Sequence, residues 1–362
     1  MIPFVDFRRE YRAIRKEIDE AIKRVLNRGR FILGPEVENF EKNFARYCGV
    51  KYCVGVNSGT DALYLSLLAA GIGGGDEVIV PVNTALPTAM AVAMSGARPV
   101  FVDCDSSSLI DIAKIPNSIT KKTKAIIPVH LYGMACDMTR LCKISKDYRL
   151  VLIEDCAQAT GARWRGKRVG AWGDFGCFSF YPTKNLGAYG DGGMIATGNK
   201  DFYKKLLAAR FYGQRDRATC STLGVNSRLD ELQAAILNAK LKYLDKWNKK
   251  RTEIADLYRR LIKNPATILP LAQSAHKHVY HLFVIRTKRR GALIKILAER
   301  GIQTMIHYPN LLHRQPFFKE SKSRSFPNAQ IFNREILSLP LYPFLKKSEV
   351  ENIARIINHT KL

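Results

Sequence analysis

The chain has 362 residues, a formal net charge of +26 and 46% hydrophobic residues, so it is long enough for about two domains with packed cores. No apolar run approaches the ~20 residues that span a bilayer, and the N-terminus lacks the apolar segment of a signal peptide. These features argue against a membrane-spanning or secreted protein, and we expect a cytoplasmic protein with no membrane partner.

The first expected element is a charged helix at about residues 7–28, after which short apolar runs alternate with helical stretches. Four runs lack polar alternation, as strands buried on both faces do, and lie at 77–81, 99–102, 124–129 and 150–153. Helical stretches such as 61–70 and 88–95 lie between them. This order predicts an α/β layered domain with a largely parallel sheet, which binds ligands beyond the carboxyl ends of its strands.

One long amphipathic helical region at 228–261 is expected to lead into a smaller C-terminal α/β domain. The elements expected in that domain are a strand at 281–285, a helix near 292–300 and a last helix near 347–358. We therefore divide the chain into a large domain, residues 1–245, and a small domain, residues 246–362.

Three stretches carry candidate chemistry, and the first is residues 57–60, Asn-Ser-Gly-Thr, where a strand ends and a helix begins. Ser58 or Thr60 suits a helix N-cap. The free N–H groups and the dipole of such a helix start also favour a phosphate. The stretch alone leaves an ordinary cap and an anion site open.

Asp155 follows the apolar run 150–153 at the expected carboxyl end of a strand. A carboxylate buried there is costly unless it is paired. It either caps a helix or forms an internal ion pair, or it holds a proton on a ligand cation. Gln158, three residues on, is placed to present its amide to the same pocket.

Lys184 lies in the stretch SFYPTKNLGAYGDGG, residues 179–193, between an aromatic run and a glycine-rich loop. A lysine amine near Asp155 and the helix start at Ser58 would complete a set of three groups. These are a Schiff-base lysine, an acidic partner for a ring nitrogen and a phosphate site, which pyridoxal 5'-phosphate requires.

The chain resembles the DegT/DnrJ/EryC1/StrS family of pyridoxal-phosphate-dependent sugar aminotransferases, which have the aspartate-aminotransferase-like fold. Eight ordered motifs carry the resemblance, at 34–45, 57–67, 75–84, 128–138, 154–162, 176–193, 224–237 and 307–318. The resemblance implies a three-layer α/β/α large domain of PLP fold type I with a mostly parallel sheet, plus the smaller C-terminal α/β domain. Pyridoxal 5'-phosphate is the implied cofactor.

By this resemblance, Lys184 matches the Schiff-base lysine, Asp155 the carboxylate that faces the pyridine nitrogen, and Gln158 the residue near the ring 3-hydroxyl. The residues that match phosphate binders are Gly59, Thr60 and Ser179. Asn226 matches an asparagine that reaches the phosphate from the neighbouring subunit, which implies a homodimer with shared active sites. Lys184 and Asp155 are the expected catalytic residues.

His307, Tyr308 and His313 resemble the family's substrate-side loop, although a packed loop with solvent-facing histidines stays an alternative. The chain departs from the family at two positions. Ala85 stands where an aromatic residue usually stacks on the cofactor ring, and Thr160 stands where many members have histidine. Neither departure affects the lysine, the acid or the phosphate site.

The resemblance implies transfer of an amino group from glutamate to a nucleotide-linked keto sugar. KNLG at 184–187 followed by GDGG at 190–193 is more typical of members that act at C3 of a 3-keto sugar. A C4-acting enzyme and a cyclitol aminotransferase stay open as alternatives. A sugar dehydratase of the same family would carry histidine in place of Lys184.

The +26 charge leaves a different class of protein open, a regulatory or nucleic-acid-binding protein on an aminotransferase scaffold. The basic residues are scattered, with short clusters at 249–251 and 288–290, and no basic helix with interleaved aromatics is present. Nucleic acid is therefore not an expected partner. The eight cysteines form no CxxC pair and no tight Cys/His cluster, so we expect reduced thiols and no metal site.

Overall fold

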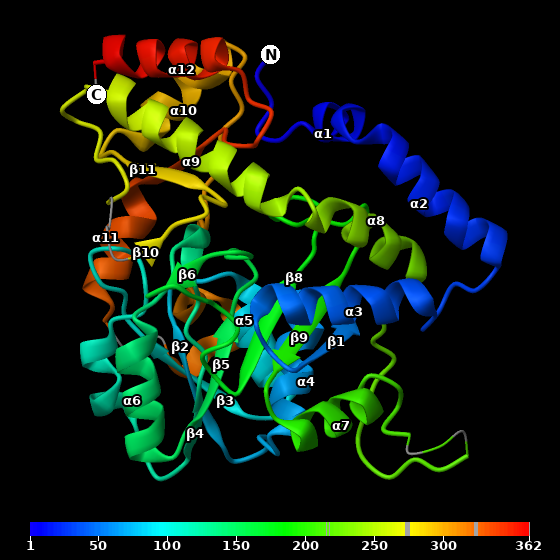
Figure 1. Cartoon of the computed structure of the whole chain (residues 1–362). Helices are drawn as coiled ribbons and strands as arrows, with labels where there is room; N and C mark the ends of the chain where they lie inside the picture. The colour runs from blue at the N-terminus through cyan, green and yellow to red at the C-terminus, as the bar shows by residue number, and fades with distance from the viewer. Residues whose placement is uncertain (215, 217, 272–275, 322–324, 362) are drawn as a thin grey trace.

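The computed structural model describes residues 1–214, 216, 218–271, 276–321 and 325–361. Its centre is a seven-stranded sheet in the order β1-β9-β8-β5-β4-β2-β3 (Figure 1). The strands are β1 (Tyr52–Val56), β2 (Glu77–Pro81), β3 (Arg98–Val102), β4 (Thr123–Ile126), β5 (Val151–Asp155), β8 (Phe175–Ser179) and β9 (Gly193–Thr197). Every pairing in this sheet is parallel except the two that β9 makes.

Helices cover both faces of the sheet (Figure 1). The helices are α1 (Phe7–Ala13), α2 (Arg15–Arg28), α3 (Pro35–Cys48), α4 (Gly59–Ala69), α5 (Leu86–Met94), α6 (Met138–Tyr148), α7 (Lys200–Ala209), α8 (Glu231–Leu241), α9 (Leu244–Leu261), α10 (Arg290–Glu299), α11 (Pro327–Glu335) and α12 (Lys347–His359). Every residue of β2, β8 and β9 is buried. Apolar strands without polar alternation require cover on both sides, and the helices provide it.

Two expected helices are each broken into two, so these predictions were wrong in detail. The charged helix at 7–28 breaks at Ile14, whose buried side chain packs with Ile18 and Trp247. The long helix at 228–261 breaks between Leu241 and Leu244. α8 packs on α2 and α3, whereas α9 packs on α12, so the chain bends where it leaves one core for another.

A second hydrophobic core lies beside the sheet domain. The paired strands β11 (Phe283–Arg286) and β12 (Ile336–Leu339) and the helices α9, α10 and α12 build it. Three short strands form a separate sheet: β6 (Arg163–Trp164), β7 (Lys167–Arg168) and β10 (His276–Lys277). A domain boundary at residue 245 stays a prediction.

The N-terminal segment joins the second core rather than the sheet domain. Ile2 is buried in this core, and its N–H donates to the Gly301 carbonyl at 2.7 Å. The Gln303 N–H donates to the Ile2 carbonyl at 3.0 Å. Residues 1–5 thus pack beside segments from the far end of the sequence, near α12 (Figure 1).

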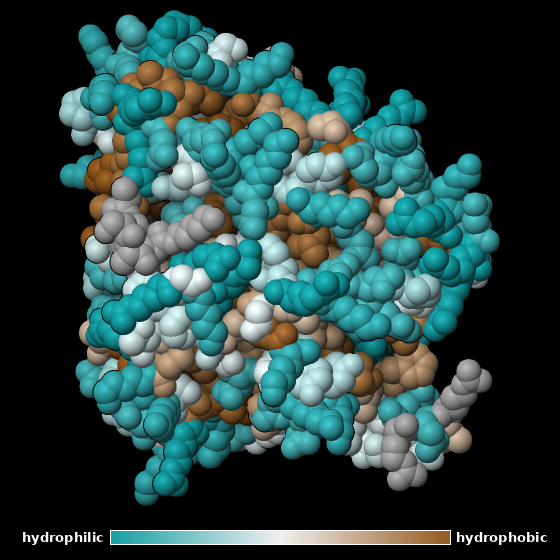
Figure 2. Space-filling model, viewed as in Figure 1, coloured by the Kyte–Doolittle hydropathy of each residue, from teal (hydrophilic) through white to brown (hydrophobic). Residues whose placement is uncertain are grey.

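Hydrophilic side chains cover most of the face shown in Figure 2. This distribution agrees with basic residues spread over a solvated surface. None of the helices in the described part of the chain has the length and apolar character that crossing a bilayer requires. Of the eight cysteines, six are buried, Cys142 is half-buried and Cys220 is exposed.

Candidate active site

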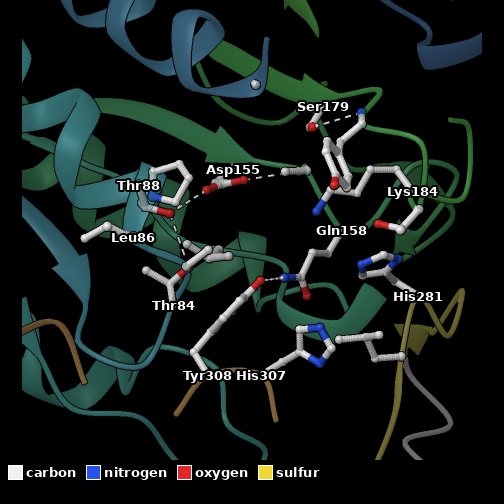
Figure 3. A pocket seen from close by; sticks show the side chains of 18 of the residues that line it. Thr84, Leu86, Thr88, Asp155, Gln158, Ser179, Lys184, His281, His307 and Tyr308 are labelled. Carbon is white, nitrogen blue, oxygen red and sulfur yellow. Dashed lines mark hydrogen bonds between the residues drawn. The ribbon is translucent and has the colours of Figure 1, made fainter. Parts of the chain in front are cut away.

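A cavity of about 530 Å³ lies where the carboxyl ends of the central strands meet the second core (Figure 3). Eight of the ten residues singled out from the sequence line it: Gly59, Thr60, Asp155, Gln158, Ser179, Lys184, His307 and Tyr308. The fold therefore gathers residues from positions 59 to 308 around one space. Open parallel sheets bind ligands at this edge.

Asp155 is the last residue of β5, and its side chain is buried. The Thr88 hydroxyl donates to Asp155 Oδ2 at 2.9 Å, and the Ala157 N–H donates to Oδ1 at 3.1 Å. Burial raises the pKa of Asp155, and these two hydrogen bonds and the nearby Lys184 oppose that rise. Two donors leave the carboxylate with lone pairs for a cationic ligand.

Thr88 was missed by the sequence analysis. It lies in α5, and its hydroxyl is also 3.2 Å from the Thr84 hydroxyl. The available signal was the spacing of Thr84 and Thr88, two hydroxyl residues that lie four positions apart on either side of the start of α5. Their contact with Asp155 depends on how α5 packs on the sheet.

Lys184 is half-buried, with its side chain in the cavity wall near His281 and Gln158 (Figure 3). Its backbone N–H donates to the Tyr181 carbonyl at 2.8 Å, which begins a tight turn. Burial lowers the pKa of the Lys184 amine to about 8, although Asp155 acts in the opposite direction. A lysine near this value supplies neutral amine at neutral pH, which a nucleophile or a base needs.

Gly187, three residues after Lys184, occupies a position that has no room for a side chain. A Cβ at this position would lie 2.2 Å from the Pro182 carbonyl oxygen, so only glycine fits. The loop therefore folds back directly on the segment that carries Lys184.

The helix start expected to bind phosphate faces the same cavity. α4 begins at Gly59, and Ser58 caps it by accepting from the Asp61 N–H at 3.0 Å. A Cβ on Gly59 would lie 2.7 Å from Ser179 Cβ, so this glycine lets Ser179 approach the helix start. Ser179 Oγ accepts from the Tyr181 N–H at 3.3 Å, which leaves its own hydrogen free to donate. These donors fit a phosphate group.

Gln158 has both ends of its amide engaged. Its Oε1 accepts from the Tyr132 N–H at 2.6 Å, and its Nε2 donates to the Tyr308 hydroxyl at 2.7 Å. The hydroxyl hydrogen of Tyr308 then remains to be donated to a ligand. In this arrangement Gln158 holds Tyr308, and Tyr308 presents the group that faces the cavity.

His307 lies at the side of the cavity formed by the second core. Its Nδ1 is 2.9 Å from the Ser338 hydroxyl, and its ring stacks on Phe4 with centroids 5.8 Å apart. Burial lowers the pKa of His307 to about 4, with Lys184 acting in the same direction. Phe4 and Val5 also line the cavity, which the sequence analysis did not foresee.

Two predicted site residues lie outside the cavity. His313 is buried, and its ring packs on Phe326 with centroids 4.8 Å apart. Asn226 is exposed and pairs with Phe211 through a backbone bridge. A role for Asn226 across a subunit interface stays a prediction.

The two departures from the family pattern have different surroundings. Ala85 lines the cavity together with Leu86, so a small side chain lies where an aromatic residue is usual. Thr160 is buried, and its carbonyl accepts from Asn248 Nδ2 at 3.0 Å.

A second buried carboxylate, Glu154, lies next to Asp155 in β5. It accepts from the backbone N–H groups of residues 170, 172 and 173 at 2.7 to 2.9 Å, and His130 Nε2 lies 3.1 Å from Oε2. His130 Nδ1 accepts from the Cys136 N–H at 3.0 Å. His130, Glu154 and Cys156 lie within metal-ligand reach of one another, but protein donors already occupy the histidine and the carboxylate.

The chain is similar to known aminotransferases over most of its length. A family model described as the DegT/DnrJ/EryC1/StrS aminotransferase family matches residues 12–358. The chain is 50% identical over 359 residues to a protein of Aneurinibacillus thermoaerophilus named dTDP-3-amino-3,6-dideoxy-alpha-D-galactopyranose transaminase, and the match covers 99% of each.

Two solved structures are similar over most of the chain. Streptomyces venezuelae DesV in complex with a ketimine intermediate has a TM-score of 0.96 and 43% identity, with 99% of this chain and 97% of that chain covered. NtdA from Bacillus subtilis with bound cofactor PMP has a TM-score of 0.88 and 34% identity, with 95% and 82% covered. The predicted fold, α/β with a mostly parallel sheet of PLP fold type I, is confirmed.

Proposed function

Because the chain belongs to the DegT/DnrJ/EryC1/StrS aminotransferase family, we propose that it aminates C3 of a nucleotide-linked 3-keto-6-deoxy sugar. Membership makes the protein a pyridoxal-phosphate-dependent transaminase. The observation that carries the assignment is the shared cavity of Lys184 and Asp155. The choice of C3 rests on the relative from Aneurinibacillus thermoaerophilus, whose name describes a 3-amino-3,6-dideoxy sugar linked to dTDP.

The residues of the cavity fit the cofactor at three points. The N–H groups of Gly59 and Thr60 and the hydroxyl of Ser179 would hold its phosphate. Asp155 would hold the pyridine nitrogen in its protonated form. Lys184 would hold the aldehyde end. When bound, pyridoxal 5'-phosphate supplies an electron sink for the substrate carbon that loses its proton.

The chain itself supplies the proton transfer. The Lys184 amine, with its pKa lowered to about 8, would take a proton from the donor's amino-bearing carbon and deliver it to the aldehyde-derived carbon C4′ of the cofactor, and it would carry a proton in the opposite direction when the keto sugar is aminated. Phe4, Leu282 and Leu341 form apolar parts of the wall of the cavity that Lys184 also lines. Apolar side chains in the wall lower the local dielectric, which strengthens the electrostatic interactions within the site.

We further propose glutamate as the amino donor and the cytoplasm as the location, following the family resemblance. The decisive experiment incubates the purified protein with glutamate and, in separate reactions, with matched 3-keto and 4-keto sugars, each linked to dTDP and to UDP, and with a keto cyclitol. Mass spectrometry and NMR identify the aminated product. Amination of the 4-keto sugar alone would overturn the C3 assignment and leave the transaminase intact, whereas amination of a keto cyclitol alone would move the substrate to a carbocycle.

The same preparation tests the regulatory alternative. A cofactor-loaded transaminase absorbs near ~400 to 430 nm, so the purified protein should be yellow. A colourless protein that takes up no added pyridoxal 5'-phosphate would favour a regulatory or nucleic-acid-binding role.

We propose a homodimer in which Asn226 acts in the neighbouring subunit's site. Its exposure and its position outside the cavity of its own subunit support this. Mixed Lys184→Ala and Asn226→Ala subunits should regain activity, because random reassociation yields some sites with both residues intact. If each variant is inactive alone and proven exchange of subunits restores no activity, the proposal of a shared active site is wrong.

A further inference from the structure

We propose that His281 is a substrate-positioning residue whose ring Nε2 accepts a hydrogen bond from a hydroxyl group of the keto sugar. The inference deepens the proposed function and rests on it. His281 was not singled out from the sequence, yet it lines the cavity beside Lys184 (Figure 3). A chain of buried hydrogen bonds fixes which of its ring nitrogens carries the proton.

The chain of hydrogen bonds ends at two backbone carbonyls, and a carbonyl can only accept. Asn185 Nδ2 donates to the Val279 carbonyl at 3.0 Å. Asn248 Nδ2 donates to the Thr160 carbonyl at 3.0 Å. Each amide is therefore fixed in one orientation, because its nitrogen and not its oxygen must face the carbonyl oxygen.

With the amides fixed, the remaining oxygens must accept. Asn248 Oδ1 accepts from Asn185 Nδ2 at 2.8 Å. Asn185 Oδ1 lies 3.2 Å from His281 Nδ1, so the ring nitrogen must be the donor. His281 is thus the Nδ1–H tautomer, and its Nε2 carries a lone pair.

The surroundings of the ring keep it neutral. Burial lowers the pKa of His281 well below its usual value, and the positive charges of Lys184 and Arg251 act in the same direction. Arg251 is itself held close by, since its guanidinium donates to the His281 carbonyl at 3.4 Å and to the Leu341 carbonyl at 3.0 Å. At neutral pH the ring therefore offers an acceptor without adding a charge beside the lysine.

Most of the polar side chains that line this cavity carry a hydrogen to donate. Thr60, Ser179, Lys184 and Tyr308 all offer hydrogens. Two carboxylates also line the cavity, namely Asp155, which is assigned to the cofactor, and Asp191. A sugar hydroxyl needs a partner for its own hydrogen when it leaves water, and His281 Nε2 is that partner. Because Asn185 directly follows Lys184 in the chain, the same segment orients the histidine and the lysine.

Two variants test the proposal. His281→Phe keeps a ring of similar size and removes the acceptor, whereas His281→Gln places an amide oxygen near the position of Nε2. Thermal unfolding verifies that both variants fold. The two half-reactions are then followed separately by the absorbance of the bound cofactor, first with glutamate and then with the keto sugar.

His281→Phe should raise the KM for the keto sugar about 10- to 100-fold, as expected for the loss of one hydrogen bond to a substrate hydroxyl. The glutamate half-reaction should keep its rate, and His281→Gln should recover most of the lost affinity. Equal slowing of both half-reactions, or an unchanged KM for the keto sugar, would overturn the proposal. Failure of the wild-type protein to react with any keto sugar would instead overturn the proposed function.

A measurement without turnover completes the test. Nitrogen-15 NMR of the cofactor-free protein, with His281→Phe used to assign the signal, should show a protonated Nδ1 and an unprotonated Nε2 at neutral pH. The opposite tautomer would remove the acceptor and overturn the proposal, whether or not a substrate had been found.

Discussion

Glu154 and Asp155 are adjacent buried carboxylates in β5, and they face different environments. Successive side chains of a strand point to opposite faces. Glu154 contacts three backbone N–H groups and His130, so each of its two carboxylate oxygens has two hydrogen-bond partners within the protein. Among the residues that the structure describes, the Asp155 carboxylate accepts from the Thr88 hydroxyl and the Ala157 N–H alone, and Asp155 lines the cavity.

The difference shows how a carboxylate that stabilises the fold can be told from one that serves a ligand. A buried charge is tolerated when it is fully paired, and it then locks the segments around it. Glu154 fixes the loop at residues 170–173 in this way. Asp155 keeps unused lone pairs and a raised pKa, which a cationic partner in the cavity would reverse.

Removal of the lysine tests whether the cavity side of β5 carries the chemistry at all. Lys184→Ala should lower turnover by about 10³-fold or more, because the amine that moves the proton is gone. Circular dichroism should show an unchanged fold. Multiple turnover of Lys184→Ala at the wild-type rate would show that the cavity beside β5 is not the site of the reaction.

Replacement of the Asp155 carboxylate should lower the turnover rate and leave the free energy of unfolding nearly unchanged. Asp155→Asn keeps an acceptor for Thr88 but cannot hold a proton on a ring nitrogen by charge. Turnover should fall by about 10²-fold. A steady-state assay beside a denaturant titration measures both quantities, and an unchanged rate would assign Asp155 a structural role.

The matched variant Glu154→Gln should lower the free energy of unfolding and leave the turnover rate nearly unchanged. Its amide nitrogen would face a backbone N–H, which leaves a buried donor without a partner. The free energy of unfolding should fall by about 3 kcal/mol, while turnover per folded molecule stays close to wild type. A slow but fully stable Glu154→Gln protein would contradict this division of roles.

The pKa of Lys184 gives a pH test of the cavity side. The folded value of about 8 lies below the unfolded value of ~10.4. Between these values the folded, cofactor-free protein binds fewer protons at this site than the unfolded chain, so stability rises with pH. The gain should reach about 3 kcal/mol relative to Lys184→Ala, whose curve lacks this contribution. If the free energies of unfolding of the wild type and Lys184→Ala changed in parallel from pH ~7 to ~10.5, burial would not lower the pKa of the Lys184 amine.

The smallest expected effect concerns the phosphate end. Gly59→Ala places a Cβ 2.7 Å from Ser179 Cβ, so the helix start and Ser179 must separate. Affinity for pyridoxal 5'-phosphate should fall about tenfold, which corresponds to about 1.4 kcal/mol. Gly198→Ala is the matched control, because a Cβ there has no atom of the described residues within 4 Å. Equal affinities in a titration of the two cofactor-free variants would remove the phosphate role from Gly59.

The sequence was sufficient for groups that lie in one short stretch of chain. Asp155 at a strand end and Lys184 before a glycine turn are set by local structure, and the structure brings both to one cavity. Thr88 and His281 were not predictable, because their roles depend on packing between distant elements. The long helix at 228–261 was wrong for the same reason, since its bend is set by two separate cores.

The exposed Cys220 makes this chain convenient for site-specific labelling. Burial raises the pKa of the six buried thiols, so a maleimide dye should attach first at Cys220. Cys220 lies six residues before Asn226, between α7 and α8. The anisotropy of such a dye, followed during dilution, would therefore report directly whether a second subunit covers this segment.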